Sequence, residues 1–366
     1  MTPLAFCLLL AASPSAATTA KTGLPSARPA AVGLVPERLA RIDESFRRIV
    51  DEKQIAGAVQ PANTHATPVR PVAAPLPAKK TYAYKSVGDC SIRADVFRPD
   101  DERPRPVILW LHGGAFIWGS RTRIRPEQLA RYVKEGFVVV AIDYRLAPET
   151  KLPAILDDLK DAYEWIRKAG PALFHADPDR IVVVGHSAGG YLALMGGLIL
   201  TPPPRALVSF YGYGDISGDW CKHPDAHYSQ QPAVSREAAG NAVGSAILTE
   251  ALYEQRWPFY LYCRQQGRWA REVAGEEADV ERFCPIRHVT QVFPPTLLLH
   301  GNRDTDVPFE QSVRMAEELR GKGVACELIT LADRGHAFDS GDGMGDPPVA
   351  NAFERVIRFV KERADR

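Results

Sequence analysis

Continuous hydrophobic runs alternate with helical patterns along the sequence from residue 81 onward. Runs typical of strands buried on both faces occupy residues 106–112, 137–143, 181–185, 206–211, 296–300 and 324–331. Apolar residues recur at helical spacing in the stretches 125–135, 153–168, 188–200, 310–321 and 349–363. Residues 82–87 and 92–97 alternate like an edge hairpin with its turn at 88–89. The repeated order of strand, helix and strand predicts an α/β fold, with a mostly parallel sheet covered by helices on both faces.

One segment, residues 212–290, interrupts this alternation. It is rich in aromatic side chains, among them Trp220, Tyr228, Trp257 and Trp269. An insertion of this kind between two core strands predicts a helical cap over a functional site. An ordinary helical excursion with a small core of its own would give the same pattern, and a cap also needs such a core.

The first eighty residues have a different character. Residues 1–20 contain an apolar stretch followed by proline and small residues, which predicts a signal peptide and a secreted or periplasmic protein, although no Lys or Arg precedes the stretch. The alternative is an unprocessed N-terminus in a cytoplasmic protein. Residues 36–54 show helical spacing and predict a surface helix, and five prolines between Pro61 and Pro77 predict an extended linker. We therefore expect an N-terminal extension over 21–80 and one globular domain over 81–366.

Composition excludes several classes of partner. Lys and Arg total 45 against 44 Asp and Glu, and no basic run is present, so we expect no nucleic-acid partner. The longest apolar stretch, Leu4 to Ala12, is too short for a transmembrane segment. No Cys-x-x-Cys pair occurs, and we expect neither a metal nor a cofactor. Cys221, Cys263 and Cys284 all lie in the interrupting segment, where one disulfide is conceivable in an oxidising compartment.

A nucleophile motif joins a predicted strand to a predicted helix. Gly185, Ser187 and Gly189 form Gly-x-Ser-x-Gly at that junction, where a tight turn presents the serine hydroxyl clear of the sheet. The bland alternative is a glycine-rich turn with an idle serine. A serine hydroxyl needs a neighbouring base. We expect His336 in this role because it lies in the loop between the last strand and the last helix, whereas the side chain of His186 should project away from Ser187.

Two aspartates, Asp304 and Asp306, follow the run 296–300 and could orient the histidine. Asp306 lies next to the following helix and suits an N-cap, so Asp304 is favoured as the acid. The chain order Ser187, Asp304, His336 is typical of one particular fold.

Backbone donors and pocket residues are expected beside the serine. Adjacent glycines follow the run 106–112, and the amides of Gly113, Gly114 and Ala188 are predicted to bind a developing oxyanion. Three aromatic residues flank these motifs and either line a substrate pocket or pack in the core: Phe116, Trp118 and Tyr191.

Five motifs in this order resemble one known family. HGGAF, DYRLAPE, GHSAGG, HGNRDTDVP and RGHAF are similar to motifs of the α/β-hydrolase fold and, within it, of carboxylesterases of the hormone-sensitive lipase group. The resemblance covers residues 81–366 and implies nucleophile Ser187, acid Asp304 and base His336, with no cofactor. Ala115 stands where the group usually has a third glycine, and His186 where it has an acidic residue, so the subfamily stays open.

A second, shorter resemblance concerns residues 36–54 with the following IAGAV, which is similar to the start of the serine β-lactamase and penicillin-binding protein family. No Ser-x-x-Lys occurs in the chain, so we do not expect that chemistry. The expected function is hydrolysis of small-molecule carboxylic esters with small or short acyl groups through an acyl-enzyme. An amidase or peptidase acting on small acylated amides would use the same residues. A non-catalytic ligand-binding relative would be expected to lack part of the triad.

Overall fold

The structure, a computed structural model, describes residues 77–275 and 279–365. The expected signal peptide, the helix at 36–54 and nearly all of the proline-rich linker lie outside these residues. The first strand starts at Lys79, close to residue 81, where the globular domain was expected to begin.

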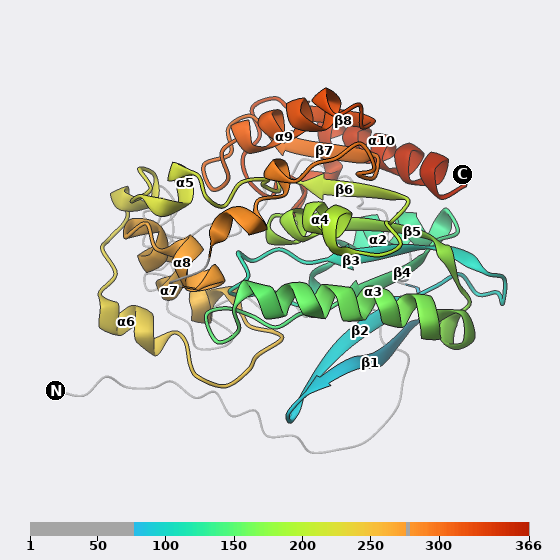
Figure 1. Ribbon diagram of the computed structural model, residues 1–366, viewed down its shortest axis with the longest axis horizontal. Coiled ribbons are helices and arrows are strands. Elements are labelled where there is room, and N and C mark those ends of the chain that lie inside the picture. The colour runs from blue at the N-terminus through green and yellow to red at the C-terminus, as the bar shows by residue number, and fades with distance from the viewer. Residues whose placement is uncertain (1–76, 276–278, 366) are drawn as a thin grey trace, which may run out of the picture. The chain divides into compact units, whose positions relative to one another are not determined.

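An eight-stranded sheet forms the centre of the fold (Figure 1). Its strands follow in the order β1-β2-β4-β3-β5-β6-β7-β8; β1 and β2 are antiparallel to their neighbours, and the other strands run parallel. The strands are β1 (Lys79–Val87), β2 (Cys90–Phe97), β3 (Arg105–Leu111), β4 (Val138–Ile142), β5 (Ala176–His186), β6 (Ala206–Phe210), β7 (Thr296–Gly301) and β8 (Cys326–Leu331). The sequence-based prediction of a mostly parallel sheet, with an edge hairpin, is confirmed.

Helices cover both faces of this sheet. They are α2 (Pro126–Lys134), α3 (Leu152–Phe174), α4 (Ala188–Ile199), α9 (Glu310–Gly321) and α10 (Pro347–Ala364). Side chains of β3 show the division, because Val107 and Leu109 pack in the cluster that includes α3 and α4, whereas Ile108 and Trp110 pack with α2 and α10. Since successive strand residues point to opposite faces, the continuous apolar runs are explained by burial on both sides.

Helix α3 is longer than the sequence pattern predicted. The pattern predicted a helix over 153–168, yet the helix continues past Gly170 and Pro171 to Phe174. The buried Phe174 ring packs against Trp165 and Tyr82, with centroids 5.3 and 5.9 Å away, and this packing favours the additional turn. Strand β5 then starts at Ala176, where a first pair with Arg105 forms before the apolar run.

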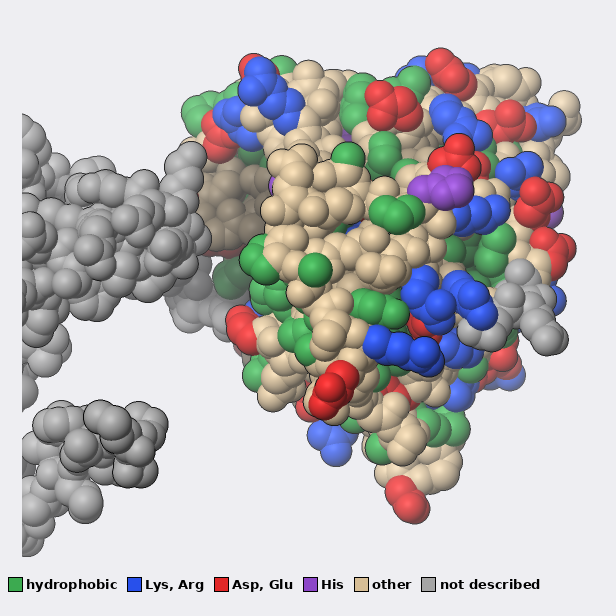
Figure 2. Space-filling model, turned by 90° about the vertical axis from the view of Figure 1, so that its left-hand side faces the viewer, with side chains coloured by type: hydrophobic (Ala, Val, Ile, Leu, Met, Phe, Trp, Pro, Cys, Tyr) green, Lys and Arg blue, Asp and Glu red, His purple; other side chains and the backbone are tan. Residues whose placement is uncertain are grey.

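The segment between β6 and β7 forms the cap. It contains α5 (Asp219–Lys222), α6 (Arg236–Asn241), α7 (Tyr253–Gln265) and α8 (Trp269–Ala274), with short 3₁₀ turns at Tyr228–Gln230, Val280–Phe283 and Pro285–Arg287. These helices lie beyond the carboxyl ends of the parallel strands, on the left in Figure 1. Figure 2 faces that side and shows a largely uncharged surface with Lys and Arg side chains gathered near its centre.

Contacts between residues that are far apart in sequence fix the cap to the strand–helix loops. Ala251 pairs with Gly119 as an isolated antiparallel bridge, and the amide of Leu146 donates to the carbonyl of Leu248. The buried pair of Arg256 and Glu149 adds a bidentate link, at 2.9 and 3.0 Å.

Cysteines within the described residues are all free thiols, so the conceivable cap disulfide is not formed. The Cys221 thiol instead donates to the carbonyl of Ile216, and the Cys284 thiol to Asp215. Across residues 77–275 and 279–365, no helix is long and apolar enough to cross a membrane. Nor does this part of the chain gather three His, Cys, Asp or Glu residues that could hold a metal ion.

A buried charge cluster ties the hairpin, the loop after β4 and α3 together. The carboxylate of Asp158 is fully buried and accepts from the Arg145 guanidinium at 2.7 and 2.8 Å. The ammonium of Lys85 on β1 lies 2.7 Å from the same carboxylate. A buried charge of this kind stabilises the fold only while its partners are present.

We predict that Asp158→Ala lowers the free energy of unfolding by about 3–5 kcal/mol, because it leaves the buried Arg145 without its counter-charge. Urea unfolding followed by tryptophan fluorescence measures this change. The matched control is Asp157→Ala, which removes an exposed carboxylate paired with Lys160 and should cost at most about 0.5 kcal/mol. Equal losses in the two variants would contradict the prediction.

Candidate active site

The turn between β5 and α4 carries Ser187 in a strained backbone conformation, with φ 54° and ψ −116°. Two glycines permit the turn. A Cβ atom on Gly185 would lie 2.0 Å from the carbonyl oxygen of Gly189, and one on Gly189 would lie 2.2 Å from that of Leu111. Because such distances are far below van der Waals contact, any side chain at either position would displace the turn.

The three residues predicted as a triad form a continuous series in which His336 lies within hydrogen-bonding distance of both Ser187 and Asp304. The Ser187 hydroxyl is 3.0 Å from Nε2 of His336, and Nδ1 of His336 is 2.7 Å from Oδ2 of Asp304. With Nδ1–H donating to the carboxylate, Nε2 is left to accept the serine proton. The geometry therefore suits proton transfer from Ser187 to His336.

Asp304 is held in place by a second histidine, His300, and by its own loop. Its fully buried side chain accepts from the amides of Asp306 and Val307 at 2.8 and 2.9 Å, and His300 Nε2 lies 3.1 Å from it. Burial favours the neutral acid, yet hydrogen bonds from His300 and His336 outweigh it and hold the pKa of Asp304 below its ordinary value. Asp304 is thus charged wherever His336 acts as a base.

The sequence suggested that Asp306 would cap the following helix, but the structure shows that it does not. Helix α9 starts at Glu310, with Phe309 in the N-cap position. The carboxylate of Asp306 turns instead toward the site, and its Oδ2 lies 3.5 Å from Nε2 of His336. Burial alone would lower the pKa of His336, but the charges of Asp306 and Asp304 outweigh it, so this pKa is raised.

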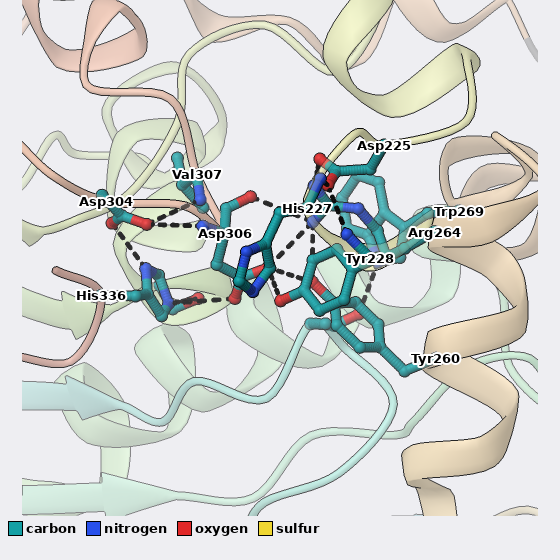
Figure 3. A network of polar contacts seen from close by, with 12 residues as sticks. Asp225, His227, Tyr228, Tyr260, Arg264, Trp269, Asp304, Asp306, Val307 and His336 are labelled. Atoms are coloured by element: carbon teal, nitrogen blue, oxygen red, sulfur yellow. Dashed lines mark hydrogen bonds and ion pairs between the residues drawn. The ribbon is translucent and has the colours of Figure 1, made fainter. Parts of the chain in front are cut away.

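Cap side chains converge on the other oxygen of Asp306 (Figure 3). Tyr228 donates to Oδ1 at 2.9 Å, Arg264 donates at 2.9 Å, and Tyr260 donates as well. Arg264 also pairs with Asp225 of the cap at 2.6 Å. The charge of Asp306 is therefore partly compensated from the cap, while its second oxygen stays beside His336.

The loop after β3 brings free amides to Ser187. A Cβ on Gly113 would lie only 3.2 Å from that of Ser187, which shows how closely the two segments approach. Within the described part of the chain, the amides of Gly113, Gly114 and Ala188 donate to no acceptor. Three unused N–H groups next to a serine hydroxyl are the arrangement that an oxyanion requires.

Tyr144 and His112 contact this loop and hold its backbone in place. Their rings stack with centroids 4.1 Å apart, and the Tyr144 hydroxyl donates to the carbonyl of His112 at 2.8 Å. His112 in turn bonds the Gly113 carbonyl through Nδ1 at 2.7 Å. Burial lowers the pKa of His112 to about 4, so the ring stays neutral at physiological pH.

A cavity of about 560 Å³ contains Ser187 and His336 in its wall. Of the three aromatic residues expected to line a pocket, Trp118 lines this cavity, and Phe116 and Tyr191 do not. The latter two are fully buried and pack edge to face on one another, with centroids 5.6 Å apart. The Tyr191 hydroxyl also donates to the carbonyl of Phe283, which places this ring in the core between α4 and the cap.

A second buried network holds the loop that carries His336. Asp339 accepts from the hydroxyl of Tyr211 at 2.7 Å and from Gln128 at 2.8 Å, and His186 lies 3.1 Å away. The ring of Tyr211 contacts that of His336, with centroids 4.7 Å apart. His186 therefore points away from Ser187, as the sequence predicted, and meets an acid from the histidine loop.

Sequence reasoning missed several residues of this site. Asp339 was not singled out, although it lies only three residues after His336. Cap residues Tyr228, Tyr260 and Arg264 were noted at most as part of an aromatic-rich insertion. The pairing of Arg264 with Asp306 spans 42 residues, and no local pattern reveals a contact of that kind.

Comparison with known proteins now defines the class. The family model BD-FAE matches residues 94–319, which is more than half of the chain. The chain belongs to this family of α/β hydrolases. Together with the eight-stranded sheet, this makes the protein an esterase-like hydrolase.

Solved structures share the fold. An α/β hydrolase superfamily protein from Enterococcus faecalis superimposes with a TM-score of 0.62 at 24% identity, covering 78% of this chain and 99% of that one. The butyrate-bound esterase Est2 of Thermogutta terrifontis superimposes with a TM-score of 0.55 at 24% identity, covering 78% and 94%.

Curated relatives are far longer proteins. The non-reducing polyketide synthase Preu3 of Preussia isomera is 27% identical over 332 residues, which cover 76% of this chain and 13% of that protein. The synthase atr1 of Stereocaulon alpinum is 28% identical over 303 residues, covering 71% and 12%. The chain thus spans only about an eighth of the length of these relatives.

We predict that Asp306→Asn moves the acid limb of the pH profile of kcat/KM to lower pH. The substitution removes the charge that raises the pKa of His336 and leaves Arg264, which lowers it, without this counter-charge. Because the base works only when neutral, a lower pKa extends activity toward acid. Glu310→Gln removes an exposed carboxylate from the start of α9 and should leave the profile in place. An unchanged or upward-shifted limb in Asp306→Asn would rule out this role for Asp306.

Proposed function

We propose that the protein is a serine esterase that hydrolyses carboxylic esters with small or short acyl groups. The observation that carries this proposal is the hydrogen-bonded series Ser187, His336 and Asp304 on a strained turn, with unused amides beside the hydroxyl. A serine, a base and an orienting acid in this geometry are the parts that acyl transfer needs.

In the proposed reaction, His336 Nε2 takes the proton of Ser187 as the hydroxyl oxygen attacks the ester carbonyl. The amides of Gly113, Gly114 and Ala188 bind the negative oxygen of the tetrahedral intermediate. His336 then gives its proton to the leaving alcohol, and an acyl-enzyme remains on Ser187. Water, deprotonated by the same imidazole, attacks the acyl group, and its proton returns to Ser187 as the acid leaves.

The expected acyl size is supported by a solved structure that shares the fold. In the present cavity, aromatic side chains of the loop after β3 and of the cap line the space that contains Ser187, including Trp118, Trp257 and Tyr260. Est2 of Thermogutta terrifontis, which shares the fold, has been solved with butyrate and with propionate bound. Short carboxylic acids of this size would fit a cavity of about 560 Å³.

We predict that Ser187→Ala lowers kcat for p-nitrophenyl acetate and butyrate by about 10⁴-fold or more, because the nucleophile is lost. The matched control is Ser229→Ala, which removes an exposed serine hydroxyl of the cap and should retain wild-type rates. A fluorophosphonate probe should label wild type and Ser229→Ala but not Ser187→Ala. Wild-type turnover by Ser187→Ala would refute the assignment of the nucleophile.

The amide alternative is tested with a matched pair of substrates. We predict that p-nitrophenyl butyrate has a higher kcat/KM than butyryl p-nitroanilide, since an amide leaving group must be protonated on a weakly basic nitrogen as it departs. Both reactions are followed by absorbance on the same enzyme. A higher value for the anilide would favour an amidase.

A further inference from the structure

The wall of the cavity at Ser187 has an aromatic part and a basic part. In the aromatic part, Trp118 meets two cap rings edge to face, with centroids 5.3 Å from Tyr253 and 5.0 Å from Tyr260. Among the described residues, Asp306 is the only acidic residue that lines the cavity, and it is bound by Arg264 and two tyrosines.

The basic part consists of two arginines, Arg123 and Arg125, from the segment that leads into α2. They line the cavity together with Trp110, Ser340 and Gly341. The same cavity wall includes Ser187 and His336, and Arg125 contacts Ser340, which lies four residues after His336.

Arg125 is held in position at the cavity wall, where it contributes a fixed positive charge. Its Nη2 donates to the Ser340 hydroxyl, whereas its buried Nε makes no hydrogen bond within the described chain. The nearest acid oxygen, Oδ2 of Asp339, is 3.6 Å from Nε and already accepts from Gln128 at 2.8 Å. Asp339 also accepts from Tyr211 and faces His186, so its charge is shared among several donors.

Arg123 is an uncompensated cation. Its side chain is exposed, and within residues 77–275 and 279–365 it makes no ion pair or hydrogen bond. Its charge nevertheless acts inside the site, because it adds to burial in lowering the pKa of His112, the residue before Gly113. A guanidinium at the cavity wall without a protein counter-ion is free to bind one from solution.

We propose that Arg123 and Arg125 form an anion-binding subsite, so that the preferred substrates are esters that also carry an anionic oxyacid group such as a carboxylate. The inference rests on the proposed function and names its substrate class. Guanidinium groups recognise planar carboxylates through paired N–H donors, and they keep their charge across the working pH range. The anion would lie toward Arg123 and Arg125, and the apolar part of the ester would lie among the cap rings.

Two substrate pairs test the subsite, one with the charge on the acyl side and one with it on the alcohol side. The first is 4-nitrophenyl hydrogen adipate against 4-nitrophenyl hexanoate, and the second is 3-acetoxybenzoate against 3-acetoxybenzamide. For at least one pair we expect wild type to favour the anion in kcat/KM by about tenfold or more, the effect of one charge-assisted contact. Raising the salt concentration should reduce this preference.

Variants assign the preference to the two arginines. Arg123→Gln should lower the ratio of kcat/KM for the anionic over the neutral ester by about threefold or more, and the double variant with Arg125→Gln should bring it close to one. The matched control is Arg131→Gln, which removes a guanidinium of α2 that pairs with Glu135 and Glu354 outside the cavity. That variant should keep the wild-type ratio. Should Arg125→Gln fail to fold, the exposed Arg123 still provides the test.

A binding assay separates this inference from the proposed function. Two proteins are titrated calorimetrically with 3-acetoxybenzoate, with 3-acetoxybenzamide and with hydrogen adipate. One is the Ser187→Ala variant, and the other carries Arg123→Gln in addition. Tighter binding of the anions that is lost with Arg123 supports the subsite even if no ester is turned over. Hydrolysis of neutral esters without any anion preference, in rate or in binding, overturns the subsite and leaves the esterase assignment intact.

Discussion

Close approach of three backbone segments at Ser187 is the constraint on which the site depends. The end of β5 at Gly185, the start of α4 near Gly189 and the loop at Gly113 are so close that side chains at these glycines would meet backbone or Ser187 atoms within about 3 Å. Because these contacts fix the serine, the base and acid need only be delivered by loops at the same edge of the sheet. The parallel order of β5, β6, β7 and β8 does this, since every strand ends at that edge.

Two aspartates act on the imidazole of His336, one at each ring nitrogen. Asp304 orients Nδ1, and its own charge is secured by His300 and by loop amides. Asp306 faces Nε2 and raises the pKa of the imidazole, so the proposed base would be strengthened at the cost of activity in acid. The buried Asp339 anchors the same loop through Tyr211, whose ring lies against that of His336.

Much of the fold and of the candidate site was predictable because the signals were local. Apolar runs marked the buried strands, and glycine motifs at strand ends marked where Ser187 and Gly113 would lie. The prolongation of α3 to Phe174 was not predictable, since tertiary packing of one ring overrode the local effect of Pro171. Asp306 was misplaced for a similar reason: its neighbours in sequence suggested a helix cap, but its partners come from the cap segment far along the chain.

The cap has a consequence for how members of this fold diverge. It touches both halves of the proposed machinery, because Trp269 donates to the carbonyl of Ala115, Ala251 pairs with Gly119, and Arg264 binds Asp306. A segment attached in this way is not an interchangeable module. Exchanging it for the cap of a relative would alter the loop that continues from the proposed oxyanion amides of Gly113 and Gly114, and would change the strength of the proposed general base at the same time. Selection for a new substrate through the cap would therefore also retune the pH range of the enzyme.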